Sequence, residues 1–277
     1  MPLTKYVARA IASGGRRHLP GSAGFRAECS ALPFCVLQPT PFYVQRLRAA
    51  HAELLTNELV QTHLCGTQFS LDRKSATGLT VALPFGDLEP SEFAHLFAVY
   101  EGSRVHAQRE RPKWAPEGMY FTVVNGKVLQ YKNKIGLVEL EEEEGTALYV
   151  PHQLFIDQFF LAGDAPELLG TASFALCAIT AHLCRLKFIE LIAGGGVGFN
   201  EKLIGYRVWP KMGFDAPLED GEAAHVQGAQ SVLDVVSADP MWWEENGSQR
   251  VMTFDLAPDS RSWEKLLSYL HEKALVT

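Results

Sequence analysis

The chain has 277 residues, of which 47% are hydrophobic and 21% charged, so it carries enough apolar side chains to build a sizeable core. Its net charge is −7 and its pI is near 5.7, which excludes the overall positive field typical of nucleic-acid-binding proteins. We therefore predict a folded protein with no nucleic-acid partner.

The pattern of cysteines and of apolar segments predicts the cellular compartment of the protein. The five cysteines form no CxxC pair and are odd in number, which favours a reducing environment. Cys177 and Cys184 lie one heptad apart on an apolar helical face, which predicts buried structural thiols. The most apolar window, residues 172–193, contains four ionisable side chains, too many for a membrane span. With no resemblance to a secretory signal at the N-terminus, we expect a soluble, cytoplasmic protein without a membrane partner.

Residues 1–66 are predicted to form an irregular extension followed by a helix. The first 39 residues are rich in Gly, Ser, Arg and Pro, and their basic excess suits either an anionic partner or a solvated terminus. From Phe42 to Leu64 the apolar residues recur at spacings of three and four, which predicts a helix. His51 and His63 on this helix are interpreted as surface histidines.

Residues 67–277 are predicted to form one α/β domain. Its first half contains a strand over 78–85, a helix over 90–100 with Pro90 in its first turn, and a strand over 135–140. Asn125-Gly126 lies between two β-rich runs within 119–131, which predicts a hairpin. The acidic run 141–144 is typical of a solvated loop.

The centre of this domain is a strand–helix–strand unit. A strand over 154–161 precedes a glycine-bearing loop over 167–172, an apolar helix over 173–187, a strand over 188–193 and a glycine run. This order predicts adjacent strands joined by a packed crossover. The tail adds a strand over 250–256 and a helix over 260–274, and Trp242 and Trp243 between them are interpreted as core or as a ligand-facing aromatic wall.

The loop over 167–172 has the features of an anion-binding helix start. Backbone N–H groups in the first turn of a helix have no intrahelical partner, and they point toward a ligand at the preceding loop. Gly170 lacks the Cβ that would block close approach of a pyrophosphate.

The segment 206–215, Tyr-Arg-Val-Trp-Pro-Lys-Met-Gly-Phe-Asp, resembles the C-terminal signature of the GNAT family of acyl-CoA-dependent N-acyltransferases. Gly170 and Ala172 in the loop also match the family pattern, and the resemblance covers about residues 118–256. The same segment is similar to GNAT-like domains of uncharacterised bacterial and phage-associated proteins. It implies a mixed central sheet, splayed between two strands and flanked by helices. It also implies acetyl-CoA or another acyl-CoA as co-substrate, without a metal. The residues that it assigns to the co-substrate are Leu168, Leu169, Gly170, Thr171, Ala172, Asn200 and Trp209.

The resemblance implies acyl transfer to the amine of a small molecule or a protein. Such a transfer needs a base for the amine proton and a donor for the leaving thiolate. Asp157 and Glu190 are the candidate bases, and for each we keep the alternative of an exposed strand end or an ion pair. Tyr206 is the candidate donor, unless it only packs.

Two departures from the family pattern define a second hypothesis. Glu167 stands where the family prefers Gln or Arg, and a carboxylate repels a pyrophosphate unless it turns to solvent. Trp209 stands in place of the usual tyrosine, and an indole N–H does not protonate a thiolate. The alternative function is therefore a catalytically inactive GNAT-like binding or assembly module. The oligomeric state is not predicted.

Overall fold

A computed structural model describes residues 41–139, 152–200, 202–219, 221–223 and 225–277, with side chains from residue 45 onward. The strands are β1 (Phe69–Leu71), β2 (Lys74–Ser75), β3 (Val81–Leu83), β4 (Gly86–Leu88), β5 (Ser103–Glu110), β6 (Gly118–Val124), β7 (Asn133–Glu139), β8 (His152–Gln158), β9 (Phe188–Gly196) and β10 (Ser248–Asp255). The helices are α3 (Pro41–Thr56), α4 (Glu58–His63), α5 (Pro90–Leu96), α6 (Leu169–Leu183), α7 (Gly205–Lys211), α8 (Val232–Ala238), α9 (Pro240–Asn246) and α10 (Arg261–Glu272). The interpretations of residues 1–39 and 141–144 concern parts of the chain outside these ranges.

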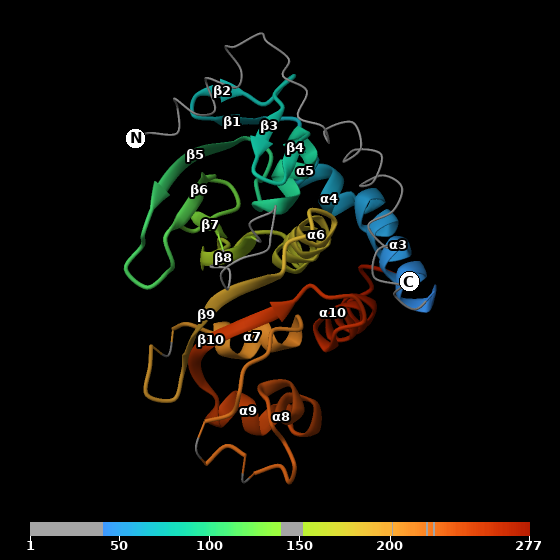
Figure 1. Ribbon diagram of the computed structural model, residues 1–277, viewed down its shortest axis with the longest axis vertical. Coiled ribbons are helices and arrows are strands. Elements are labelled where there is room, and N and C mark those ends of the chain that lie inside the picture. The colour runs from blue at the N-terminus through green and yellow to red at the C-terminus, as the bar shows by residue number, and fades with distance from the viewer. Residues whose placement is uncertain (1–40, 140–151, 201, 220, 224) are drawn as a thin grey trace, which may run out of the picture.

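Eight strands form one mixed sheet in the order β10-β9-β8-β7-β6-β5-β1-β2 (Figure 1). The pairs β8–β9 and β1–β5 are parallel, and the other neighbours are antiparallel. Strands β3 and β4 pair with each other in a separate two-stranded sheet. The prediction of an α/β fold is confirmed, and so is the crossover, because α6 joins the parallel strands β8 and β9.

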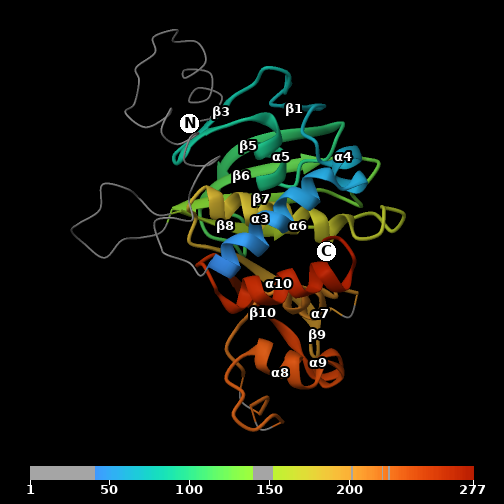
Figure 2. The same ribbon diagram turned by 90° about the vertical axis from the view of Figure 1, so that its right-hand side faces the viewer.

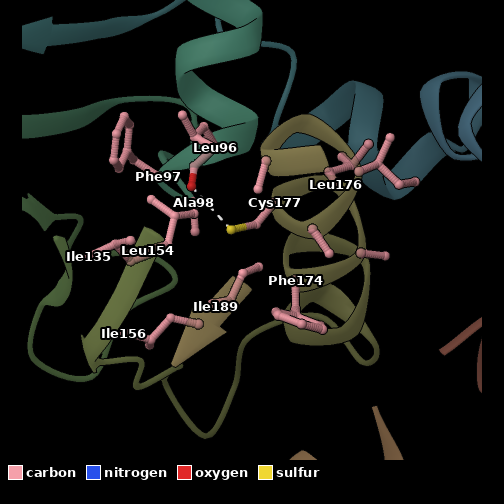
Figure 3. Packing of buried hydrophobic residues seen from close by; sticks show 14 of the residues in the cluster. Leu96, Phe97, Ala98, Ile135, Leu154, Ile156, Phe174, Leu176, Cys177 and Ile189 are labelled. Carbon is pink, nitrogen blue, oxygen red and sulfur yellow. Dashed lines mark hydrogen bonds between the residues drawn. The ribbon is translucent and has the colours of Figure 1, made fainter. Parts of the chain in front are cut away.

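Helices α3, α4, α5, α6 and α10 lie along one face of this sheet (Figures 1 and 2). The short helices α7, α8 and α9 gather near β9 and β10 (Figure 1). The core lies between the sheet and the helical layer, where Leu154 and Ile156 of β8 and Ile189 of β9 belong to the same buried cluster as α6 (Figure 3).

Helix α6 is the central helix of the fold because its surface is apolar nearly all round. Twelve of its residues are buried, and a helix that is hydrophobic on every side must be covered on every side. The sheet covers one side, and α5 covers another, where the Cys177 thiol donates a hydrogen bond to the Leu96 carbonyl oxygen at 3.1 Å (Figure 3). Burial of Phe174 or Leu176 contributes about 1.5–3 kcal/mol each. Cys177 and Cys184 are buried, as predicted.

The helix predicted over 42–64 is two helices, because the helical backbone is interrupted at Asn57. This residue has extended backbone dihedrals, and its side chain accepts a hydrogen bond from the Leu59 N–H at 2.9 Å, which starts α4. The apolar spacing is continuous across the break, so Leu54 and Leu64 both reach the core. Sequence periodicity alone therefore did not reveal the cap.

The hairpin predicted over 119–131 pairs differently. Strand β6 pairs with β7, so Val123 lies opposite Asn133 and the connection is much longer than the expected Asn125-Gly126 turn. The residues expected to form the second strand of the hairpin, 127–131, lie between β6 and β7 and belong to neither strand. The Asn125 side chain is buried and donates to the Glu101 carbonyl oxygen at 2.9 Å and to the Ser103 hydroxyl at 3.1 Å. These tertiary hydrogen bonds override the local turn preference of the dipeptide.

Several element boundaries also differ from the predictions. Helix α5 ends at Leu96 rather than at residue 100, because Ala98 has a left-handed φ of 49°. The strand expected over 78–85 is only the three residues of β3. Strand β9 extends through Gly196, so part of the predicted glycine turn is strand. The terminal helix α10 agrees with the expectation, with Trp263 and Leu270 in the core. Among the described residues, no helix combines the length and apolar character needed to cross a membrane.

The histidine predicted to be exposed on α3 is instead largely covered. Burial lowers the pKa of His51. Burial also lowers the pKa of His95 on α5 to about 4, and the charge of His51 adds to this effect, while a hydrogen bond from the imidazole to the backbone of Leu64 opposes it. The two rings are therefore neutral in the folded protein at pH 7, and their protonation opposes folding.

We expect the free energy of unfolding to fall as the pH drops from about 6.5 to about 4. The unfolded chain takes up a proton at His95 in this window and the folded protein does not, which costs about 1.4 kcal/mol per pH unit, or roughly 3 kcal/mol in total. Urea unfolding at successive pH values measures the slope. His95→Gln is expected to flatten the curve. Equal slopes for the wild-type and His95→Gln proteins would contradict this assignment.

Candidate functional site

The parallel strands β8 and β9 pair over three residues only and then part. Leu154, Phe155 and Ile156 of β8 lie opposite Ile189, Glu190 and Leu191 of β9. Within the described chain, β8 then continues along β7 and β9 along β10, while the loop after β9 returns to it at the bridge between Gly195 and Ile204. The inner edges of the two strands beyond this point form a fork, which we define as residues 157–158 of β8 and 192–196 of β9.

A β-bulge stands where β8 leaves β9. On β7, the neighbours Lys134 and Ile135 pair with Gln158 and Ile156, so Asp157 is an extra residue without an opposing partner. A bulge bends its strand and re-aims a side chain. Here it turns β8 one residue after the last pair with β9, and it places Asp157 at the start of the fork.

Strand β9 has an irregularity of its own on the other side of the fork. Ala193 pairs with Arg250 of β10, and Gly196 pairs with Ser248. The two positions on β9 are three residues apart and those on β10 are two apart, so β9 contains one extra residue. Gly195 lies in this bulge with φ of 103°, and the following loop folds back so that Ile204 forms a bridge with Gly195. A Cβ on Gly195 would overlap the carbonyl oxygen of Leu203. Glycine is therefore required at this position for backbone conformation and for close approach.

The start of α6 offers unpaired backbone donors. Leu168 has a left-handed φ of 63°, and the Ala172 N–H bonds to its carbonyl oxygen at 2.9 Å. The N–H groups of Gly170 and Thr171 have no hydrogen-bond partner among the residues that the structure describes. The region predicted as a loop is thus partly helix, since α6 begins at Leu169. A helix start of this kind attracts anions.

Gly170 also serves packing. A Cβ there would lie 3.0 Å from Cδ1 of Leu161 and 3.7 Å from Phe159, so both side chains rest against the helix start. Leu169 and Ala172 point into the core and are fully buried. Among the residues assigned to a co-substrate, Leu169 and Ala172 therefore contribute backbone only. Glu167 is exposed, which places its carboxylate in solvent.

Trp209 lies between the end of β8 and α6. Its ring packs edge-on against Phe159 and Phe174, each 5.7 Å away between centroids, and against Phe214 at 5.1 Å. It is 9% exposed. In the described residues no acceptor takes a hydrogen bond from its indole N–H. Trp209 therefore fills the wall between helix and strand with an apolar ring.

The Tyr206 side chain connects α7 to α9. Its hydroxyl donates to the Glu244 carbonyl oxygen at 2.7 Å, and its own carbonyl oxygen accepts from the Trp243 indole N–H at 2.8 Å. Trp243 is buried, which agrees with its interpretation as core, and Trp242 stacks on His225 at 4.2 Å.

The last residue assigned to the co-substrate lies outside this region. Asn200 is exposed and caps the loop after β9, accepting from the Lys202 N–H at 3.0 Å.

Asp157 belongs to a charged cluster on the sheet face opposite α6. The Lys134 ammonium lies 2.8 Å from Glu110 and 3.7 Å from Asp157, and its side chain is 11% exposed. Burial raises the pKa of the Asp157 carboxyl, Lys134 opposes the rise and Glu110 adds to it. Burial also raises the pKa of the neighbouring Tyr120, whose hydroxyl donates to the Pro116 carbonyl oxygen at 2.6 Å.

Glu190 lies on the same face, one strand away. It accepts a hydrogen bond from the Gln153 amide at 3.0 Å, and the Thr253 hydroxyl lies 3.5 Å from its other oxygen. The Glu190 carboxylate therefore has side-chain partners on both neighbouring strands, β8 and β10. Sequence analysis missed Lys134, Glu110 and Gln153, although alternation along β5, β7 and β8 places them on one face.

Comparisons with known proteins assign no relatives: no family model, no curated protein and no solved structure matches the chain. Within the described residues, no group of three or more His, Cys, Asp or Glu side chains is arranged to hold a metal ion. The fork, the start of α6 and the Asp157 cluster are therefore the features from which a function is inferred.

Gly195→Ala is expected to destabilise the fold by about 2–4 kcal/mol, because the new Cβ requires a strained left-handed backbone and displaces the Leu203 carbonyl. Gly198→Ala is the matched control, with a φ of 78° and open space around its Cβ, and it carries only the backbone penalty of about 1–2 kcal/mol. Urea denaturation measures both. Equal losses in the two variants would mean that the loop moves freely away from β9.

Proposed function

We propose that the chain is an acyl-CoA-dependent N-acyltransferase with a GNAT-like fold, which transfers an acetyl or other acyl group to an amine. The observation that carries this proposal is the fork, where two parallel strands part at the bulged Asp157 beside a helix start with two unpaired N–H groups. The sequence resemblance supports the class of co-substrate. The parting strands and the two unpaired N–H groups suit the amides and the pyrophosphate of such a co-substrate.

The fork suits an extended chain that carries amide groups. Where two strands part, backbone N–H and C=O groups that would otherwise pair face the opening, and they bind an extended segment as a sheet edge does. The pantetheine arm of CoA carries such amides. The N–H groups of Gly170 and Thr171 would receive the pyrophosphate, while Glu167, being exposed, does not need to face it.

Asp157 is the residue that we assign as base. A base for an amine must be ionised at neutral pH yet more basic than an ordinary carboxylate. Burial and Glu110 raise the pKa of Asp157, and Lys134 at 3.7 Å opposes the rise and favours the ionised form. The amine nitrogen attacks the thioester carbonyl, its proton passes to Asp157, and the C–S bond breaks as the thiolate leaves.

A catalytically inactive module with the same fold is the second candidate. It is favoured by Tyr206, whose hydroxyl proton is already committed to the Glu244 carbonyl oxygen, and by Trp209, which packs among phenylalanine rings. Neither provides an available proton donor for the thiolate. The enzymatic proposal therefore takes this proton from water, which direct transfer permits because positioning supplies most of the rate.

Binding of CoA is tested at the start of α6. Acetyl-CoA is expected to raise the melting temperature of the wild-type protein by mass action. Thr171→Pro removes one unpaired N–H without removing an intrahelical bond, because this position lies in the first turn, and we expect it to weaken binding about tenfold. Thr171→Ala keeps the N–H and retains the shift. If acetyl-CoA does not raise the melting temperature of the wild-type protein, both the acyltransferase proposal and the assignment of acyl-CoA as co-substrate are contradicted.

The role of Asp157 is tested by Asp157→Asn. Removing a general base lowers turnover by about 100- to 10,000-fold, while the acetyl-CoA-induced shift in melting temperature is retained. The limb of the pH–rate profile that reports the base should lie above the ordinary range of an aspartate, as the raised pKa requires. Glu139→Gln, at the exposed end of β7, is the control for a lost carboxylate. A variant that binds acetyl-CoA and turns over like the wild-type protein would exclude Asp157 as the base.

A further inference from the structure

The sheet face opposite α6 carries a buried polar atom that has no partner. Gln153 is 5% exposed, and its Oε1 has no hydrogen-bond donor in the described structure. Its Nε2 donates to Glu190, so a flipped amide would set Oε1 against a carboxylate and is excluded by charge. Leaving a buried carbonyl oxygen without a donor is unfavourable. Gln153 Oε1 can therefore accept a hydrogen bond from a ligand bound beside Glu190.

A hydrogen-bond donor with positive charge suits this position best. Gln153 Oε1 and both oxygens of Glu190 are acceptors, and in the described part of the chain the Thr253 hydroxyl lies beside Glu190. A primary ammonium group offers three N–H donors and one positive charge. It would satisfy the amide oxygen and neutralise the carboxylate at once.

A second acidic position lies along the same face. Phe155 is paired with Glu190, and Asp157 is two residues further along β8. In a regular pair, a rise of about 3.3 Å per residue and about 4.8 Å between strands separates the Cα atoms of Asp157 and Glu190 by roughly 8 Å, and the parting of the strands at the bulge adds to this distance. Lys134 contacts both Glu110 and Asp157, and the charge of Lys132 also acts on Asp157, so Asp157 is a carboxylate with one acidic and two basic neighbours.

The surface between the two acidic positions is apolar. Phe155 and Ile192 belong to a small hydrophobic cluster with Tyr120 and Val138, on the same face as Glu190. The arrangement along the face is therefore carboxylate, apolar side chains, carboxylate. An alkyl chain with an amine at each end matches this order.

We propose that the acyl acceptor is an aliphatic diamine, with one amine at Asp157 beside the fork and the other held as an ammonium ion by Glu190 and Gln153. This inference rests on the proposed acyl transfer and adds the substrate class to it. The amine at Asp157 forms the C–N bond as the C–S bond of the acyl-CoA breaks, and its proton passes to Asp157. The distal ammonium stays protonated. The roughly 8 Å span fits a chain of about four or five carbons, with C–C bonds of about 1.5 Å.

The probes are 1,4-diaminobutane, 1,5-diaminopentane and, as the singly charged control, butylamine. Binding is measured by calorimetry without an acyl donor, and products are measured by mass spectrometry with acetyl-CoA. We expect the diamines to bind at least tenfold more tightly than butylamine, and Glu190→Gln to remove this advantage while keeping the shape of the side chain. Glu139→Gln should keep the advantage, and unchanged melting temperatures show that the variants remain folded.

The outcomes separate this inference from the proposed function. Equal affinities for the diamines and butylamine, or an advantage that survives Glu190→Gln, would mean that Gln153 is satisfied by an ordered water only and would overturn the diamine. If acetyl-CoA still raises the melting temperature in that case, the acyltransferase proposal stands. A Glu190-dependent diamine advantage without any response to acetyl-CoA would support the amine site and overturn acyl transfer.

Discussion

The early end of the pairing between β8 and β9 is the constraint on which the rest of the structure depends. Three opposed residues hold the strands together, and the bulge at Asp157 then bends β8 along β7. Because each strand keeps its outer neighbour, the sheet opens without losing its remaining hydrogen bonds. The opening costs a few interstrand bonds only, and within the described sheet it leaves the inner edges of two parallel strands open apart from the bridge between Gly195 and Ile204.

The packing of α6 keeps this opening in place. Twelve buried residues fix the helix against the sheet and against α5, so its first turn cannot shift relative to the fork without exposing apolar area. Trp209 and its phenylalanine neighbours fill the space between the helix and the end of β8. The same contacts that stabilise the core therefore hold the N–H groups of Gly170 and Thr171 beside the parting strands, and a binding site gains preorganisation from them.

The two faces of the sheet differ in polarity. The face toward α6 is apolar and continuous with the main core. The opposite face carries Asp157, Lys134, Glu110, Glu190 and Gln153, several of them largely buried. Burial of charged and polar groups is unfavourable unless they are paired. The cluster is consequently a poor source of stability, and an arrangement that persists at such a cost is typical of a binding or catalytic surface.

The sequence by itself determined the α/β class, the strand–helix–strand unit and the buried face of α10, because these follow from local hydrophobic periodicity. It also indicated Gly170, Asp157 and Glu190 as site residues, and the structure places Asp157 and Glu190 on one face of neighbouring strands. Only the tertiary structure decided that Asp157 is a bulge residue beside Lys134, that Tyr206 binds a backbone carbonyl of α9, and that Asn125 is buried rather than in a tight turn. Each of these depends on a partner distant in the chain, and local sequence patterns do not encode which partner a side chain meets.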